Sequence, residues 1–221
     1  MTRTPPTLGQ VVRDAPDVAH EPTPLPADPP QQVVERRQVG VGHAPCHHGE
    51  ILQGVFLDAD GHPCRGLVTL PVPGTGTTAT FVRRPGSPAG HLTVRPADRR
   101  KARRAAVLAV AECARLTGER TCGGRLGLHG QVPVGIGMGS STSDVIAAVR
   151  AVAASFGLRL PAETVARIAV RAERASDPLM LDGSAALFAS REARVLEDFG
   201  HPCPPPSSSP APPTRAARWT P

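Results

Sequence analysis

Residues 133–144, PVGIGMGSSTSD, combine three alternating glycines with two serines in a pattern suited to binding an anion. Glycine adopts backbone conformations that other residues avoid and lets a ligand approach the main chain closely. A predicted strand precedes the stretch and a predicted helix follows it, so unpaired N–H groups and the positive end of the helix dipole converge there. The motif therefore predicts a phosphate-binding loop. The alternative is a tight strand-to-helix turn in which a serine caps the helix.

Two common nucleotide motifs do not fit this loop. A Walker A loop requires Gly-Lys followed by Ser or Thr before the helix, whereas residues 139–141 read GSS. A dinucleotide fingerprint requires a third glycine where Ser140 stands, and an acidic residue at the end of a strand about twenty residues later. The sequence LRLP at 158–161 provides no such acid.

A third pattern fits the loop: a proline, then glycine, a hydrophobic residue, glycine and two serines. In this respect the segment resembles the nucleotide loop of the GHMP kinase superfamily, which includes galactokinase, homoserine kinase and mevalonate kinase. The resemblance implies that the loop wraps the phosphates of ATP, and that a serine hydroxyl, here Ser141, helps to hold Mg²⁺. The residues it assigns to nucleotide binding are Pro133, Gly135, Gly137, Met138, Gly139, Ser140, Ser141 and Thr142.

A second segment, GHAPCHHGEILQG at 42–54, resembles the first motif of the same superfamily. It is most similar to the branch that contains the L-threonine kinases of cobalamin synthesis, although Cys46, His47 and His48 depart from the pattern of that branch. The resemblance implies that Glu50 or His48 faces a substrate hydroxyl or amine. The alternative is a buried polar pair that closes the edge of a sheet.

Acidic residues follow in AERASDPLMLDG at 172–183. Phosphoryl transfer needs a cation to neutralise the phosphates and a group that positions the attacking hydroxyl. By resemblance, Glu173 at the end of a helix binds Mg²⁺ and Asp177 meets the substrate hydroxyl, with Asp182 as the reserve candidate. The alternatives are a surface glutamate paired with a neighbouring arginine and an aspartate that serves only in a turn before Pro178.

The helices and strands that must position these residues are predicted from the periodicity of apolar residues and from the glycines and prolines that end such segments. We expect helices over 100–117, 140–156 and 161–175, and a hairpin loop at 85–90 between two strands. The fold class is therefore α+β, a two-layer arrangement with a mixed sheet and helices on one side. We expect strands at 39–44, 50–58, 67–72, 77–84, 91–96, 124–133, 186–190 and 194–199.

Twenty-six prolines concentrate at the two ends of the 221-residue chain. Such segments bury too little apolar surface to fold, so we expect disordered tails at 1–35 and 201–221 around an ATP-binding domain at 36–200. The resemblance implies a second domain with another glycine-rich motif, and this sequence does not contain that motif. A partner chain or a homodimer that supplies the other half is therefore one hypothesis, and a non-catalytic binding remnant is another.

The net charge of +6 suggests nucleic acid as a ligand. The superfamily's N-terminal half also shares its architecture with ribosome-related folds, so a basic nucleic-acid-associated domain stays a third hypothesis. The densest basic run, residues 99–104, lacks stacking aromatic residues and is typical of a solvated helix face. Five cysteines without a CxxC pair, no signal peptide and no long apolar run favour a reduced, cytoplasmic protein that acts on a small molecule away from membranes.

Overall fold

The structure is a computed structural model, and it describes residues 38–133, 135–182 and 184–202. Its centre is an antiparallel pair of long strands, β1 (Val39–Leu57) and β2 (Pro63–Arg84). We expected four separate strands in this stretch, and that prediction was wrong. The intervening prolines and glycines instead produce register shifts between Pro45 and Cys46 and again around Glu50, while the pairing continues on both sides.

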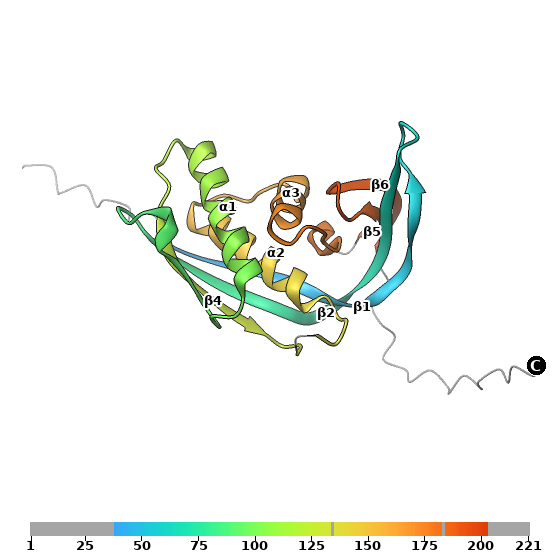
Figure 1. Cartoon of the computed structure of the whole chain (residues 1–221). Coiled ribbons are helices and arrows are strands. Elements are labelled where there is room, and N and C mark those ends of the chain that lie inside the picture. The colour runs from blue at the N-terminus through green and yellow to red at the C-terminus, as the bar shows by residue number, and fades with distance from the viewer. Residues whose placement is uncertain (1–37, 134, 183, 203–221) are drawn as a thin grey trace, which may run out of the picture. The chain divides into compact units, whose positions relative to one another are not determined.

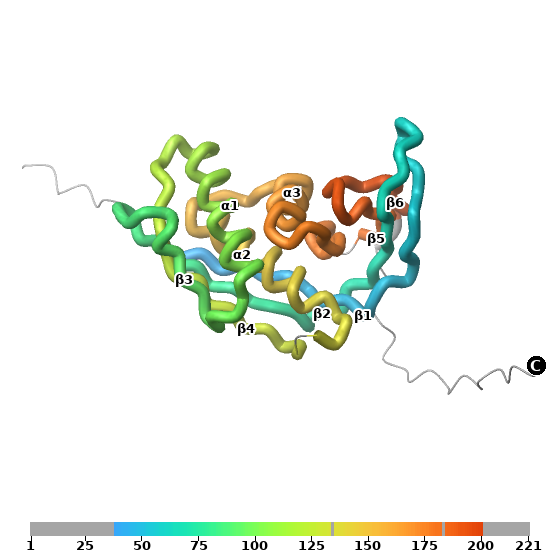
Figure 2. The backbone as a smooth tube through the Cα atoms, viewed as in Figure 1, coloured from blue at the N-terminus to red at the C-terminus, as the bar shows by residue number. Residues whose placement is uncertain are grey.

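Two further pairs of strands extend the sheet on the opposite side of β2. β4 (Gly123–Gly130) pairs with the second half of β2, and β3 (Leu92–Arg95) lies beyond it. β5 (Ser184–Ala189) pairs with the first half of β2, and β6 (Arg194–Pro202) lies beyond β5. Figure 2 shows these two pairs at opposite ends of the sheet. The expected hairpin around residues 85–90 was wrong, because β3 pairs in parallel with β4 and not with β2.

Three helices cover one face of this mixed sheet, which confirms the predicted α+β class (Figure 1). They are α1 (Arg100–Thr117), α2 (Ser140–Ser155) and α3 (Ala162–Glu173). α1 ends at Gly118 with φ 70°, as the sequence predicted. α3 ends earlier than expected, because Arg174 adopts a left-handed conformation with φ 73°. Two short 3₁₀ turns, Ala89–His91 and Leu179–Leu181, complete the described elements.

α2 is the central element of the fold and is buried on nearly all sides. It packs against β1 so closely that Gly40 and Gly42 are needed on the strand. A Cβ added at Gly40 would lie 2.2 Å from the carbonyl oxygen of Ala151 in α2. Aliphatic and alanine side chains of α1, α2 and α3 then fill a core with very few aromatic rings. This close packing fixes the start of α2 relative to the sheet.

The predicted tails lie almost entirely outside the described residues. β6 continues to Pro202, two residues past the expected end of the domain. Cys46, Cys64, Cys113 and Cys122 are free and buried, whereas Cys203 lies outside the described residues. No helix in the described ranges is both long enough and apolar enough to span a membrane.

Candidate active site

The glycine-rich loop is folded as the alternation of glycines requires. Gly135, Gly137 and Gly139 all have positive φ values, of 89°, 79° and 65°. Residues other than glycine rarely adopt a positive φ, so each of these positions requires glycine for its backbone conformation. Gly139 is the N-cap of α2, and no side chain caps the helix there. The first turn of α2 therefore presents backbone N–H groups without a side-chain partner, which is the requirement for an anion site.

Two residues of the motif anchor the start of α2 to the sheet. Ser143 accepts a hydrogen bond from the backbone N–H of Thr77 in β2 and donates one to the carbonyl of Ala44 in β1. Asp144 accepts a hydrogen bond from the Thr77 hydroxyl at 2.7 Å and pairs with Arg99 at 3.0 Å. Burial raises the pKa of Asp144, and these two partners oppose that rise. The small polar residues after the loop thus hold its helix in place.

A cavity of about 600 Å³ opens at this end of α2. Of the predicted nucleotide-binding residues, Gly139, Ser141 and Thr142 line it. The remaining five are Pro133, Gly135, Gly137 and Met138 in the preceding loop, and Ser140 at the first position of α2. Glu50, Glu173 and Asp177 line the same cavity, so the three segments singled out in the sequence meet there.

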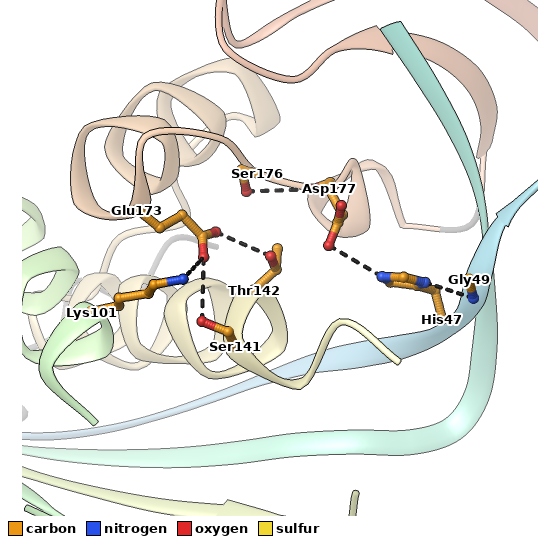
Figure 3. A network of polar contacts seen from close by, with 8 residues as sticks. All are labelled: His47, Gly49, Lys101, Ser141, Thr142, Glu173, Ser176 and Asp177. Carbon is orange, nitrogen blue, oxygen red and sulfur yellow. Dashed lines mark hydrogen bonds and ion pairs between the residues drawn. The ribbon is translucent and has the colours of Figure 1, made fainter. Parts of the chain in front are cut away.

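Glu173 ends α3 and turns its carboxylate toward the first turn of α2 (Figure 3). The Thr142 hydroxyl donates to it at 3.1 Å, and the Ser141 hydroxyl lies 3.4 Å from its other oxygen. The Lys101 ammonium in α1 lies 3.7 Å away. The carboxylate is only 2% exposed, and this burial raises the pKa of Glu173 to about 7, although Lys101, Ser176 and Thr142 oppose the rise. Burial thus favours the protonated form of Glu173 more than it does for an exposed glutamate.

Asp177 lies on the other side of the cavity in the connector after α3. One of its carboxylate oxygens is 3.1 Å from Nε2 of His47, and its side chain is 18% exposed (Figure 3). Asp182, the reserve candidate, does not enter this cavity. Its carboxylate pairs with Arg150 at 2.6 Å and lines a separate cavity between β1, α2 and α3. The structure therefore separates the two aspartates.

The first motif brings one of its two candidate residues to the cavity. Glu50 lines the cavity, but His48 is exposed and is not among the residues that line it. Its neighbour His47 is only 1% exposed and lies against Gly139. Consecutive residues of a strand point to opposite faces, so a choice between adjacent histidines depends on the register, which shifts at this point of β1. No spacing in the sequence reveals that shift.

Lys101 and Arg99 were also missed. They belong to the basic run that we interpreted as a solvated helix face. Lys101 is exposed, as that interpretation predicts, and Arg99 is half-buried, but both bind carboxylates. Lys101 reaches Glu173, and Arg99 pairs with Asp144. Arg100, between them, is exposed as predicted. Arg99 is the N-cap residue of α1 and Lys101 lies in its first turn, and only the arrangement of the helices identifies their partners.

Comparison with known proteins agrees with this geometry. Residues 102–189 match the family model described as the GHMP kinases N terminal domain. The match begins in α1, includes the glycine-rich loop and ends with β5. It covers about two fifths of the chain. No curated protein sequence matches this one.

Comparison with solved structures finds kinases among the chains similar to this one. The homoserine kinase from Cytophaga hutchinsonii has a TM-score of 0.50 and 14% identity, over 72% of this chain and 51% of that one. A 4-(cytidine 5′-diphospho)-2C-methyl-D-erythritol kinase has a TM-score of 0.44 and 22% identity, over 70% of this chain and 53% of that one. At these identities the likeness concerns the fold only. The chain spans about half the length of these two proteins.

Proposed function

We propose that this chain binds Mg²⁺ and ATP at the start of α2 and transfers the γ-phosphate to the hydroxyl of a small molecule. One observation carries the proposal. A glycine-rich loop at a helix N-terminus, a buried glutamate bonded to hydroxyls of that helix, and a separate aspartate meet at a single cavity. Phosphoryl transfer requires these components and little other protein chemistry.

The phosphates of ATP would be bound by the loop and the first turn of α2. Gly135 and Gly137 leave the main chain open on one side, since a Cβ at either position would meet no atom within 4 Å. The positive end of the α2 dipole and its backbone N–H groups favour a polyanion. The nucleotide-binding set is that of the sequence prediction, Pro133 to Thr142 without the residues at 134 and 136.

The donors around Glu173 fit a magnesium ion. A carboxylate and two hydroxyl oxygens are hard ligands of the kind that Mg²⁺ prefers, and Mg²⁺ commonly completes its shell with water and phosphate oxygens. Ser141 and Glu173 are the residues that would hold it. When bound, the ion would neutralise part of the phosphate charge. The raised pKa of Glu173 supports this assignment, because a buried carboxylate beside only one half-exposed ammonium lacks the counter-charge that a cation provides.

Asp177 is the residue that we assign to the acceptor. Its carboxylate would accept a hydrogen bond from the attacking hydroxyl and take its proton as that oxygen bonds to the γ-phosphorus. The bond between the γ-phosphorus and the bridging oxygen breaks, and ADP leaves with the electron pair. Lys101 lies on the phosphate side of the cavity, where its ammonium would contact the phosphate oxygens.

For the acceptor we propose a hydroxy amino acid such as L-threonine. Glu50 lines the cavity on the same side as Asp177, and Arg65 and Arg191 also line it. Among the described residues neither arginine has an ion-pair partner. A carboxylate matches these cations and an ammonium matches Glu50, so a zwitterion with a hydroxyl complements the cavity. The resemblance of residues 42–54 to the threonine kinase branch supports the same class.

Magnesium-dependent ATP binding tests this proposal directly. A ligand at 100 times its Kd should stabilise the fold by about 2.7 kcal/mol, which thermal unfolding detects as a raised midpoint. The shift should require both ATP and Mg²⁺ and should be reduced in Ser141→Ala, while Ser184→Ala, an exposed serine outside the cavity, should behave as the parent chain does. No shift at millimolar ATP would contradict the proposal.

A transfer assay with ATP and hydroxy amino acids then separates the remaining alternatives. Binding without transfer would favour the non-catalytic remnant, or a second chain that supplies further residues. The half-length match to solved kinases makes mixing with a candidate partner the next step. Binding of nucleic acid that weakens steeply with salt would instead favour the basic-domain hypothesis.

A further inference from the structure

His47 connects the two sides of the cavity, although no motif predicted a role for it. It is 1% exposed and lies in β1 at one of the register shifts. Its backbone N–H donates to the carbonyl of Met138 in the glycine-rich loop at 3.2 Å. Its ring lies against Gly139, where an added Cβ would be 2.2 Å from the ring carbon Cδ2. The same ring reaches Asp177 at 3.1 Å (Figure 3).

The tautomer of His47 follows from its two hydrogen bonds. The backbone N–H of Gly49 lies 2.8 Å from Nδ1 and can only donate, so Nδ1 must be the acceptor. The proton of the neutral ring is therefore on Nε2, which donates to Asp177 Oδ2. A ring held in this way cannot carry a proton from Asp177 onward, since both nitrogens are already committed.

A metal ion is the competing interpretation of this cluster. A ring nitrogen of His47 and one carboxylate oxygen each from Glu50 and Asp177 lie within 4.8 Å of one another, a spacing that suits a cation. Ligation of a metal by Nε2 requires a free lone pair on Nε2. The N–H of Gly49 donates to Nδ1, however, so the ring proton lies on Nε2. The tautomer therefore favours a hydrogen-bond donor over a metal ligand.

We propose that His47 is a positioning residue that holds Asp177 for the acceptor hydroxyl and fixes it relative to the phosphate loop. This inference rests on the proposed function. The Nε2–H bond engages Oδ2 and leaves Oδ1 for the acceptor. The backbone and ring of His47 also contact Met138 and Gly139. His47 therefore sets the distance between the Asp177 carboxylate and the glycine-rich loop that would bind the phosphates.

Three variants test the proposal in a transfer assay. His47→Leu removes the donor and should lower kcat about 10- to 100-fold, with the KM for MgATP changed less than about threefold. His47→Gln carries an N–H in nearly the same place and should recover at least about fivefold of that loss. His48→Leu, at the exposed neighbour, should match the parent chain. Equal losses in His47→Leu and His47→Gln, or an unchanged kcat in His47→Leu, would overturn the assignment.

A spectroscopic readout tests the same contact without any activity. Long-range ¹H–¹⁵N spectra of histidine-labelled protein report which ring nitrogen carries the proton, and His47→Gln identifies the His47 signals among those of the eight histidines. At about pH 8 we expect the Nε2–H tautomer, a changed Nε2 shift in Asp177→Ala, and no change on adding Zn²⁺. An Nδ1–H tautomer, or coordination of Zn²⁺ by His47, would overturn the proposal. Absence of MgATP binding would contradict the proposed function, and these spectra would still decide the contact.

Discussion

The carboxylate of Glu173 lies 3.1 Å from the hydroxyl of Thr142, so the last residue of α3 meets the first turn of α2. The sequence separates these residues by 31 positions. Their contact places a 2%-exposed carboxylate beside the uncapped end of the helix that follows the glycine-rich loop. The hydroxyls and Lys101 only partly replace the water that this carboxylate loses, which is why its pKa rises to about 7.

This burial predicts a pH-dependent stability in the absence of metal. The pKa of Glu173 is raised in the folded state from an ordinary value of 4.5 to about 7, so the folded chain binds the proton more tightly than the unfolded chain. Protonation of Glu173 therefore stabilises the folded state fully below about pH 4.5, and this stabilisation is lost as the pH rises through about 7. Glu173→Gln should therefore gain stability relative to the parent chain between about pH 5 and 8, by at most about 3 kcal/mol. Urea unfolding in EDTA at about pH 5 and about pH 8 measures this difference in the free energy of unfolding.

Glu192→Gln is the matched control, because Glu192 is exposed and forms no ion pair among the described residues. Its stability relative to the parent chain should be the same at both pH values. If Glu173→Gln followed the parent chain with an equal pH dependence, the carboxylate would not be desolvated as the structure indicates.

Lys101 should contribute to nucleotide affinity through its charge. Its ammonium lies 3.7 Å from Glu173 and lines the cavity. Replacement by methionine keeps much of the aliphatic stem and removes the cation, so the Kd for MgATP should rise about 3- to 10-fold, as expected for loss of one charged contact. Isothermal titration calorimetry gives this ratio.

Arg100→Met provides the comparison for Lys101→Met. It removes the same charge one residue earlier, from an exposed side chain that does not line the cavity. We expect a Kd within about twofold of the parent value. Equal losses in the two variants would mean that the net charge of the α1 N-terminus, and not a contact from Lys101, governs binding.

Two features of the sequence were sufficient to predict the backbone of the glycine-rich loop and of the helix that follows it. The period of apolar residues in α2 and the glycine alternation before it are local patterns, and the structure follows both. A glycine at every second position has few explanations other than positive φ or close approach, and Gly139 has both. Gly118 likewise ends α1 because the left-handed conformation there favours glycine.

The missed features depend on register and on packing between distant segments. Nothing local distinguishes His47 from His48, since one shift in the pairing of β1 decides which ring is buried. In the sequence Lys101 is one of several cations on a helix, and only the packing of α3 beside α1 places Glu173 next to it. Strands β1 and β2 were split in the prediction because the turn-forming residues near Gly49 and Gly74 mark irregularities, and long-range pairing carries the strands through them.

The two loop glycines Gly137 and Gly139 should respond differently to alanine. Both have positive φ, which costs an alanine about 1–2 kcal/mol. At Gly137 the added methyl meets open space, whereas at Gly139 it would lie 2.2 Å from the His47 ring. Gly139→Ala should therefore destabilise the fold by more than Gly137→Ala, and His47→Ala should recover part of that difference in a double-mutant cycle. Equal unfolding free energies for the two alanine variants would contradict the contact.

The two aspartates of the connector provide the last test of the site. Asp177 lines the cavity with Glu173, whereas Asp182 pairs with Arg150 at 2.6 Å and borders a different cavity. Asp177→Asn keeps the shape but removes the proton acceptor, so the rate of transfer should fall about 10²- to 10⁴-fold with MgATP affinity within about threefold. Asp182→Asn loses exposed ion pairs worth at most about 1 kcal/mol and should transfer phosphate as the parent chain does. Loss of transfer in Asp182→Asn with activity retained in Asp177→Asn would reverse the assignment of the acceptor side.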